Sequence, residues 1–252
     1  MSWNRLIPIL LIHRGGLWKT ERFRPKTYVG DPTNAVRIFN DKQVDELIVL
    51  DIDASKSGRG PNFDALERLA SEAFMPLCYG GGLRSLEDAK RAFSCGVEKV
   101  AINTCLTARP ALIEEIAAHA GRQATVVSMD LARQGSRLAE YSHVHGDIVS
   151  GDWAAQLEDY CQRGAGEVLV NMVDRDGTLH GPDFEAISDV AELCTVPLIA
   201  AGGVRDLVDA QAVTRVGASA VAAGAMFVYR GPYRAVLISY PEPQLVQRAL
   251  QR

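Results

Sequence analysis

The residues best suited to chemistry are acids that stand at the ends of apolar runs. Asp130 closes the run "TVVSMD", and Asp176 lies within "DRDGT" (174–178). A carboxylate in such a place can act as a general acid or base, so we predict that both aspartates are catalytic. Asp51 and Asp53 end another apolar run, but for these two we favour a structural role, capping a turn or pairing with a nearby arginine.

Two glycine turns follow apolar runs and lead into helical stretches. They are Gly80-Gly81-Gly82 and Gly202-Gly203. Backbone N–H groups without side chains around them can approach an anion closely, and the dipole of the following helix favours its charge. A single glycine pair often serves only to turn the chain. Two copies at matching positions instead favour phosphate binding, and they predict a ligand with a phosphate at each end.

The neighbouring run ends "INT" (102–104) and "AGA" (223–225) place small residues and further N–H groups beside the glycine turns. Together, the turns and run ends make up the predicted phosphate-binding set Gly81, Gly82, Asn103, Thr104, Gly202, Gly203, Gly224 and Ala225.

The chain repeats itself at long range. Residues 44–104 align with residues 165–225 without a gap, and "GGLRSLEDA" in the first copy matches "GGVRDLVDA" in the second. The same alignment pairs Glu46 with Glu167. Self-similarity of this length indicates a duplicated architecture.

Apolar, β-branched runs alternate with amphipathic helical stretches along the chain. The runs are 6–12, 46–52, 99–103, 124–131, 167–173, 196–203 and 218–225, and the helical stretches include 64–73, 85–96, 109–121 and 206–217. This alternation predicts a parallel sheet, and 252 residues suit an α/β fold of the TIM (β/α)8 barrel type. We expect one domain, 1–252, made of half-barrels of about 1–122 and 123–252.

The first apolar run carries a leucine where the duplication predicts an acid. When this run is aligned with the run that ends at Asp130, Leu11 falls opposite the aspartate. A leucine cannot transfer a proton, so one of two symmetric acids is missing.

Composition and charge argue against several classes of function. The net charge of −4 comes with no run of Lys or Arg, which disfavours nucleic acid and anionic membranes as partners. The apolar N-terminal run is far shorter than the roughly 20 residues of a membrane span. Five cysteines without CxxC spacing favour a reducing compartment, and we expect a cytoplasmic protein. "HVH" (143–145) pairs two histidines without a third ligand, so neither a metal site nor a cofactor is expected.

Four motifs show that the chain resembles the HisF family, the cyclase subunits of imidazole glycerol phosphate synthase. They are "GGGLRSLEDA" (80–89), "KVAINT" (99–104), "DRDGT" (174–178) and "IAAGGV" (199–204), and the resemblance covers the whole length. It implies a barrel that accepts ammonia from a glutaminase, HisH, and uses it to cleave and cyclise a bisphosphorylated ribonucleotide. It also implies phosphate contacts at Gly82, Asn103, Thr104, Gly177, Gly203 and Gly224, together with Thr178 in the motif of Gly177.

The resemblance has opposite implications for the two ends of the barrel. At the amino-terminal end, the family has a ring of two bases and two acids that gates ammonia, and the matching residues here are Arg5, Glu46, Lys99 and Glu167. At the other end the family uses two essential aspartates, of which this chain keeps Asp130 and has Leu11 in place of the second. The mouth loop "HRGGLWKT" retains Lys19, while Ala101 and Ala225 stand where the family often has serine.

An intact gate with an incomplete cyclase site resembles the HisF-like paralogues associated with acetamidino modification of bacterial surface sugars. This implies an ammonia relay that works with a HisH-type glutaminase and an ATP-dependent N-sugar amidotransferase in O-antigen or related polysaccharide synthesis. One alternative is a true cyclase of histidine biosynthesis, a lyase in which Asp176 or Asp51 covers the missing acid. Another is a non-catalytic activator that binds a phosphorylated small molecule and switches on a glutaminase. The related isomerase HisA has no ammonia route and needs acids on both half-barrels, so Leu11 argues against it.

Overall fold

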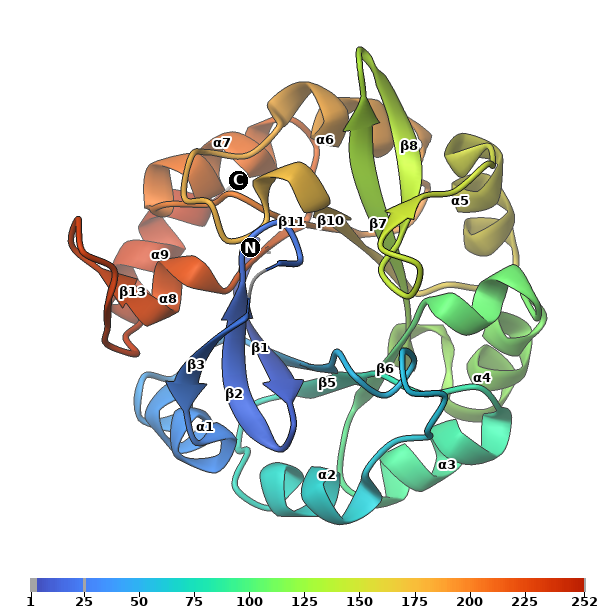
Figure 1. The fold of residues 1–252 in the computed structure, drawn as a ribbon, viewed down its shortest axis with the longest axis horizontal. Helices are drawn as coiled ribbons and strands as arrows, with labels where there is room; N and C mark the ends of the chain where they lie inside the picture. Colours follow the sequence, from blue (N-terminus) through green and yellow to red (C-terminus); the bar gives the residue numbers. More distant parts are fainter. Residues whose placement is uncertain (1–3, 25, 252) are drawn as a thin grey trace.

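The computed structural model describes residues 4–24 and 26–251, and these form a closed barrel of eight parallel strands surrounded by helices (Figure 1). In order around the barrel the strands are β1 (Arg5–His13), β4 (Leu47–Asp51), β5 (Leu77–Gly80), β6 (Lys99–Ile102), β7 (Thr125–Gln134), β10 (Glu167–Met172), β11 (Leu198–Ala201) and β12 (Ala220–Ala223). Parallel pairing of β12 with β1 and of β7 with β10 closes the ring. The predicted TIM (β/α)8 barrel is confirmed.

Helices cover the outside of the barrel (Figure 1). They are α1 (Pro32–Asp41), α2 (Phe63–Ala70), α3 (Leu86–Ser94), α4 (Leu112–Ala120), α5 (Trp153–Gln162), α6 (Phe184–Leu193), α7 (Leu207–Arg215), α8 (Ala225–Val228) and α9 (Pro243–Leu250), with short 3-10 turns η1 (Thr104–Thr107), η2 (Arg122–Ala124) and η3 (Val173–Arg175). Side-chain caps fix several helix starts, because an acceptor oxygen there satisfies N–H groups of the first turn. Ser85 caps α3 in this way and Asp206 caps α7. Within the described ranges, no helix has the length and apolar character needed to cross a membrane.

The sequence repeat is visible in the element boundaries. Helix α3 begins at Leu86 and α7 begins at Leu207, 121 residues later. Strands β6 and β12 begin at Lys99 and Ala220, with the same separation. The two halves of the barrel therefore follow one backbone plan.

A layer of apolar side chains fills the lumen of the barrel. Its fully or largely buried members are Ile7, Ile9, Leu11, Ile48, Cys78, Ala101, Val126, Leu169, Ile199, Ala201, Ala220 and Ala222. Burial, with the charge of Glu46, holds the pKa of the Cys78 thiol well above its usual value, so this group stays neutral. The lumen between the two ends of the barrel is thus lined by apolar and uncharged side chains.

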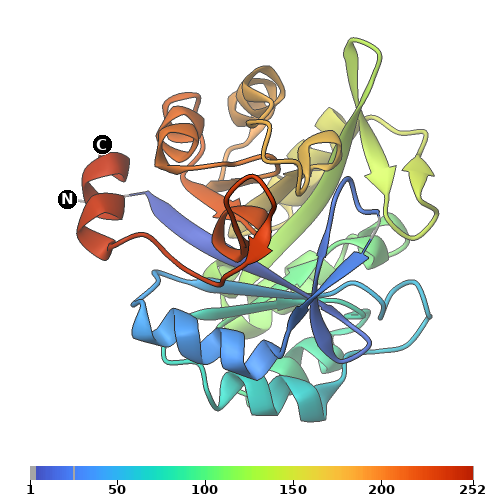
Figure 2. The same cartoon turned by 60° about the vertical axis from the view of Figure 1, so that its left-hand side comes forward.

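Antiparallel ribbons extend the strands beyond the barrel. β2 (Gly16–Thr20) and β3 (Lys26–Gly30) continue β1, and β8 (Arg137–Ser142) with β9 (Asp147–Ile148) continues β7. A third small ribbon joins β13 (Tyr229–Arg230) to β14 (Ala235–Val236). The hairpin of β7 and β8 lies on the side of the molecule opposite the chain ends (Figure 2). We call the carboxyl-terminal end of the barrel its mouth. The first two ribbons border the mouth, because they extend the carboxyl-terminal ends of β1 and β7.

Candidate functional site

One cavity opens at the mouth of the barrel, and its empty volume, including the open entrance, is about 1200 Å³. It brings together nearly all the residues predicted to act there: Leu11, Lys19, Gly81, Gly82, Asn103, Thr104, Asp130, Asp176, Gly177, Gly202, Gly203, Gly224 and Ala225. Ligand sites of TIM barrels lie at this end of the strands. A space of this size can hold a small molecule that carries two phosphates.

The two glycine turns have matching geometry on opposite halves of the cavity wall. Gly81 and Gly202 have φ angles of 121° and 108°, which side chains rarely tolerate. A Cβ on Gly81 would collide with the carbonyl oxygen of Asp51, and one on Gly202 would lie 2.6 Å from the carbonyl oxygen of Met172. Tight packing against the preceding strand therefore requires glycine at both sites. Phosphate binding by these turns stays a prediction.

The run ends beside the glycine turns also match between the halves. Asn103 precedes the turn η1, and Gly224 precedes the one-turn helix α8. The first N–H groups of such a turn have no partner within it, and Thr104 and Ala225 contribute these groups at the cavity.

Thr178 does not line the cavity with its predicted partner Gly177. Its side chain is buried, and its hydroxyl donates to the carbonyl oxygen of Arg175 at 2.8 Å. Thr178 thus holds the turn that follows β10, and the structure offers no support for a phosphate contact there.

Asp130 lies at the end of β7 and is buried at the cavity wall. The side chain of Asn103 donates to its Oδ2 from 3.0 Å, and Nδ1 of His143 lies 3.0 Å from the same oxygen. His143 belongs to the ribbon that continues β7 and also lines the cavity. The predicted acid is therefore held in place by two neighbours.

Leu11 occupies the place in the first half that Asp130 occupies in the second. Leu11 pairs with Leu50 of β4, and Asp130 pairs with Asn171 of β10. Leu50 and Asn171 are themselves 121 residues apart, as the repeat requires. The strand register thus supports the alignment made from the sequence, and the first half presents leucine to the cavity where the second presents an acid.

Asp176 and Lys19 connect the mouth ribbon to the barrel. The Thr20 hydroxyl donates to Asp176 Oδ2 at 2.6 Å, so this carboxylate holds the ribbon. Lys19 is 3% exposed, and a Cβ on Gly224 would collide with its Nζ. Burial lowers the pKa of Lys19, and the charge of Asp176 offsets part of that effect. In its charged form, the buried Lys19 side chain at the cavity is suited to meet an anion.

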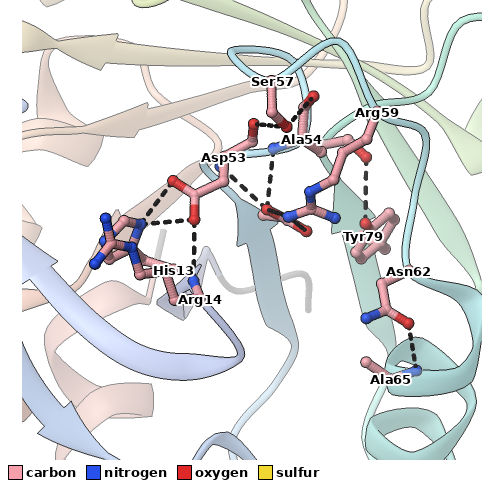
Figure 3. A network of polar contacts seen from close by, with 11 residues as sticks. His13, Arg14, Asp53, Ala54, Ser57, Arg59, Asn62, Ala65 and Tyr79 are labelled. Atoms are coloured by element: carbon pink, nitrogen blue, oxygen red, sulfur yellow. Dashed lines mark hydrogen bonds and ion pairs between the residues drawn. The ribbon is translucent and has the colours of Figure 1, made fainter.

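Asp51 and Asp53 make local contacts at the end of β4, and those of Asp53 are drawn in Figure 3. Nδ1 of His13 lies 2.6 Å from Asp53, and the backbone N–H of Arg14 donates to the same carboxylate at 2.9 Å. Arg59 forms an ion pair with Asp51 at 2.8 Å. These contacts agree with the structural interpretation of both aspartates.

The four residues of the proposed gate form a ring at the amino-terminal end of the barrel, which we call the floor ring. Lys99 Nζ lies 2.9 Å from Glu46 and 2.8 Å from Glu167, and Arg5 forms ion pairs with the same two glutamates. Burial alone would lower the pKa of Arg5, but the negative charges of Glu167 and Glu46 outweigh it and raise the pKa. Alternating bases and acids thus close this end of the lumen.

Several polar residues of the cavity went unrecognised in the sequence. The sequence suggests His143 only as half of a metal pair with His145, yet His143 lines the cavity while His145 is exposed. Ser128 and Asn171 lie within apolar runs and also line the cavity. Among the described residues no group of three or more His, Cys, Asp or Glu could hold a metal ion.

Comparison with known proteins gives consistent matches over nearly the whole chain. The model of the family described as histidine biosynthesis protein matches residues 5–234. A protein of Leptospira borgpetersenii is 43% identical over 94% of both chains, and one of Pseudomonas aeruginosa is 44% identical over 96% of this chain and 97% of its own. Their names, imidazole glycerol phosphate synthase subunit HisF and subunit hisF2, carry that assignment provisionally. The imidazole glycerol phosphate synthase subunit HisF of Exiguobacterium sibiricum, named without that reservation, is 37% identical over 90% of this chain and 91% of its own.

Proposed function

The chain belongs to the histidine biosynthesis protein family, among its HisF-type synthase subunits, and we propose that it relays ammonia instead of closing an imidazole ring. A HisH-type glutaminase docks at the floor ring and supplies the ammonia. The ammonia crosses the lumen to the mouth, where a phosphorylated small molecule binds. An ATP-dependent N-sugar amidotransferase uses it to form the acetamidino group of a surface-polysaccharide sugar.

The observation that carries this proposal is the contrast between the two ends of the barrel. The floor ring is complete, with each glutamate paired to both bases. At the mouth, Leu11 stands where the register calls for the partner of Asp130. Loss of a proton-transferring group costs about 10²–10⁴ in rate. A barrel so built is equipped to admit ammonia and poorly equipped for acid–base chemistry that needs two carboxylates.

The lumen supports passage of the neutral molecule. Its apolar layer is aliphatic apart from the neutral thiol of Cys78, and toward the cavity Ser128 and Asn171 add uncharged polar groups. Ammonium would lose its hydration in such a lining at a much higher cost than uncharged ammonia would.

The proposal is tested by reconstituting the chain with its glutaminase and following nitrogen from glutamine labelled at the amide. We expect glutamine hydrolysis that depends on this subunit, and no imidazole glycerol phosphate from the histidine-pathway ribonucleotide. The variant Lys99→Met, which breaks the floor ring, should release labelled ammonia to solvent, while Lys90→Met on the outer helix α3 should not. Normal turnover of the ribonucleotide by the unmodified pair would contradict the relay.

A true cyclase is the second candidate, and one observation favours it. Asp130, Lys19 and both glycine turns line a single cavity, as a bisphosphorylated substrate would require. Complementation of a histidine auxotroph that lacks its cyclase would support this candidate over the relay. Activation of the glutaminase without any delivery of nitrogen would instead indicate a non-catalytic activator.

A further inference from the structure

Lys19 is a buried lysine whose side chain reaches the mouth cavity. It lies near the end of β2, next to Trp18, the residue that pairs with Leu11 of β1. Only 3% of Lys19 is exposed, and the residue lines the cavity. A Cβ on Gly224 would lie 3.0 Å from Cε of this side chain, so its end packs against the backbone of the cavity wall. A ligand therefore reaches the amine through the cavity.

The acids of the cavity leave Lys19 without an ion pair. The acids that line the cavity beside it are Asp51, Asp130 and Asp176. Among the residues that the structure describes, none of these acids forms an ion pair with Lys19, and Asp51 pairs with Arg59 instead. Burial lowers the pKa of the Lys19 amine, and the charge of Asp176 offsets only part of that effect. At a given pH, more of this amine is therefore neutral than of an exposed lysine.

Leu11 helps to keep the surroundings of the amine apolar. It lines the same cavity, and it stands where the second half of the barrel has Asp130. A carboxylate at this place would favour the charged form of Lys19, because a nearby opposite charge stabilises that form. Leucine adds burial without adding charge. The apolar first half of the mouth thus favours the neutral amine.

A neutral lysine at a water-poor cavity is suited to react with a carbonyl carbon. The lone pair of Nζ attacks that carbon and forms a carbinolamine. Loss of one water then leaves an imine, with the carbonyl oxygen and both amine protons departing in that water. The imine makes the former carbonyl carbon more reactive toward nucleophiles, and attack by water restores the lysine and the carbonyl compound.

We propose that Lys19 forms a Schiff base with the carbonyl group of a phosphorylated aldehyde or ketone. The predicted phosphate contacts line the same cavity and hold the other end of this molecule. The inference goes beyond the ammonia relay, because it gives the barrel a covalent step that a relay does not require. It can be tested on this chain alone, without a glutaminase.

The test treats the isolated full-length chain with glycolaldehyde phosphate and sodium cyanoborohydride, which reduces an imine to a stable amine. Mass spectrometry of peptides then identifies the modified lysines. The reference lysines are Lys42 at the end of α1 and Lys90 on α3. At neutral pH we expect modification of Lys19 to be at least about tenfold faster, because ordinary lysines, with a pKa of about 10.4, are almost wholly protonated. Glycolaldehyde without the phosphate should show a weaker preference for Lys19.

Variants at two positions separate the Schiff base from a simple charge contact. Leu11→Asp should slow modification of Lys19 at least about tenfold, because the carboxylate favours the charged amine, while Leu11→Ile should leave the rate unchanged. Lys19→Arg keeps the positive charge and should lose the rapid modification. Circular dichroism checks that each variant is folded.

Two outcomes would overturn the proposal. One is modification of Lys19 no faster than that of Lys42, and the other is an unchanged rate in Leu11→Asp. Binding of inorganic phosphate that survives in Lys19→Arg, together with no imine in the unmodified chain, would show that Lys19 acts only as a cation.

Discussion

The two halves of this barrel share their backbone and differ in what they present to the cavity. The second half places Asp130 beside Asn171, and the first half places Leu11 beside Leu50 at the equivalent pair. The two halves thus share the strand positions of a symmetric site, but only the second half supplies polar side chains there.

Contacts that occur in both halves show which interactions hold the shared backbone. Asp53 accepts the backbone N–H of Arg14 at 2.9 Å, and Asp174 accepts that of Arg133 at 2.6 Å, in the same place of the second half. These carboxylates hold the loop after a strand in each half. Acids that serve the backbone recur in both copies, whereas the acid suited to proton transfer occurs in one.

The largest effect is expected where the halves differ most. Asp130→Asn should lower transfer of glutamine nitrogen by about 10²–10⁴, because a carboxylate suited to proton transfer at the mouth is lost. Glutamine hydrolysis by the partner should change little. The matched change Leu11→Asn alters the equivalent place of the first half, and we expect it to cost far less. Equal losses in the two variants would show that the halves act alike.

The next effect tests the frame that the halves share. Gly81→Ala and Gly202→Ala should each lower the free energy of unfolding by about 2–4 kcal/mol, because a methyl group would overlap a strand carbonyl at positive φ. Denaturant unfolding measures both. Gly15→Ala is a suitable control for positive φ alone, since a Cβ there meets nothing within 4 Å. A clearly smaller loss at one turn would mean that the two turns are not equivalent.

The sequence predicts the barrel correctly because the barrel is encoded by patterns that recur along the chain. The repeat and the alternation of runs and helices predict seven of the strands, and the short β5 is indicated only by the glycine turn that follows it. The sequence does not predict the mouth ribbons. Their strands β2 and β8 pair antiparallel with the ends of β1 and β7, and no repeated pattern in the sequence marks these pairings. Their positions depend on tertiary contacts such as that of Thr20 with Asp176.

The site was predictable where glycine spacing or resemblance marked it, and not where a contact depends on folding. The floor ring followed from the resemblance alone, because the charges stand far apart in the sequence. His143 meets Asp130 only because the chain reverses between β7 and β8. Asn171 looked like one polar residue in the apolar run "EVLVNM".

A smaller effect is expected from making the first half resemble the second. Leu11→Asp restores a second carboxylate at the mouth and should raise imidazole glycerol phosphate formation at least about tenfold above background, or ~1.4 kcal/mol in the barrier. Chromatographic detection of the product measures it. Leu50→Asn adds polarity at the neighbouring place without an acid and should give no such gain. Absence of any gain from Leu11→Asp would show that the halves differ by more than this position.

The smallest effect concerns an ion pair that only the second half makes. Arg205 hydrogen-bonds and pairs with Asp209 and lowers the pKa of that carboxyl, whereas its counterpart Arg84 donates to the carbonyl oxygen of Gly58. Folding lowers the pKa of Asp209, so the ion pair stabilises the protein at pH values above the ordinary carboxyl pKa of about 3.9. This stabilisation is lost as the pH falls through the lowered pKa of the folded state.

Arg205→Ala should therefore lower the free energy of unfolding only slightly at neutral pH, since the arginine is 52% exposed. The difference from the unmodified chain should shrink as the pH is lowered below about 4. Urea unfolding over a series of pH values measures this trend. Arg84→Ala should have a small effect that does not vary with pH, because a carbonyl oxygen does not titrate. A parallel pH trend in both variants would mean that Asp209 is not the group responsible.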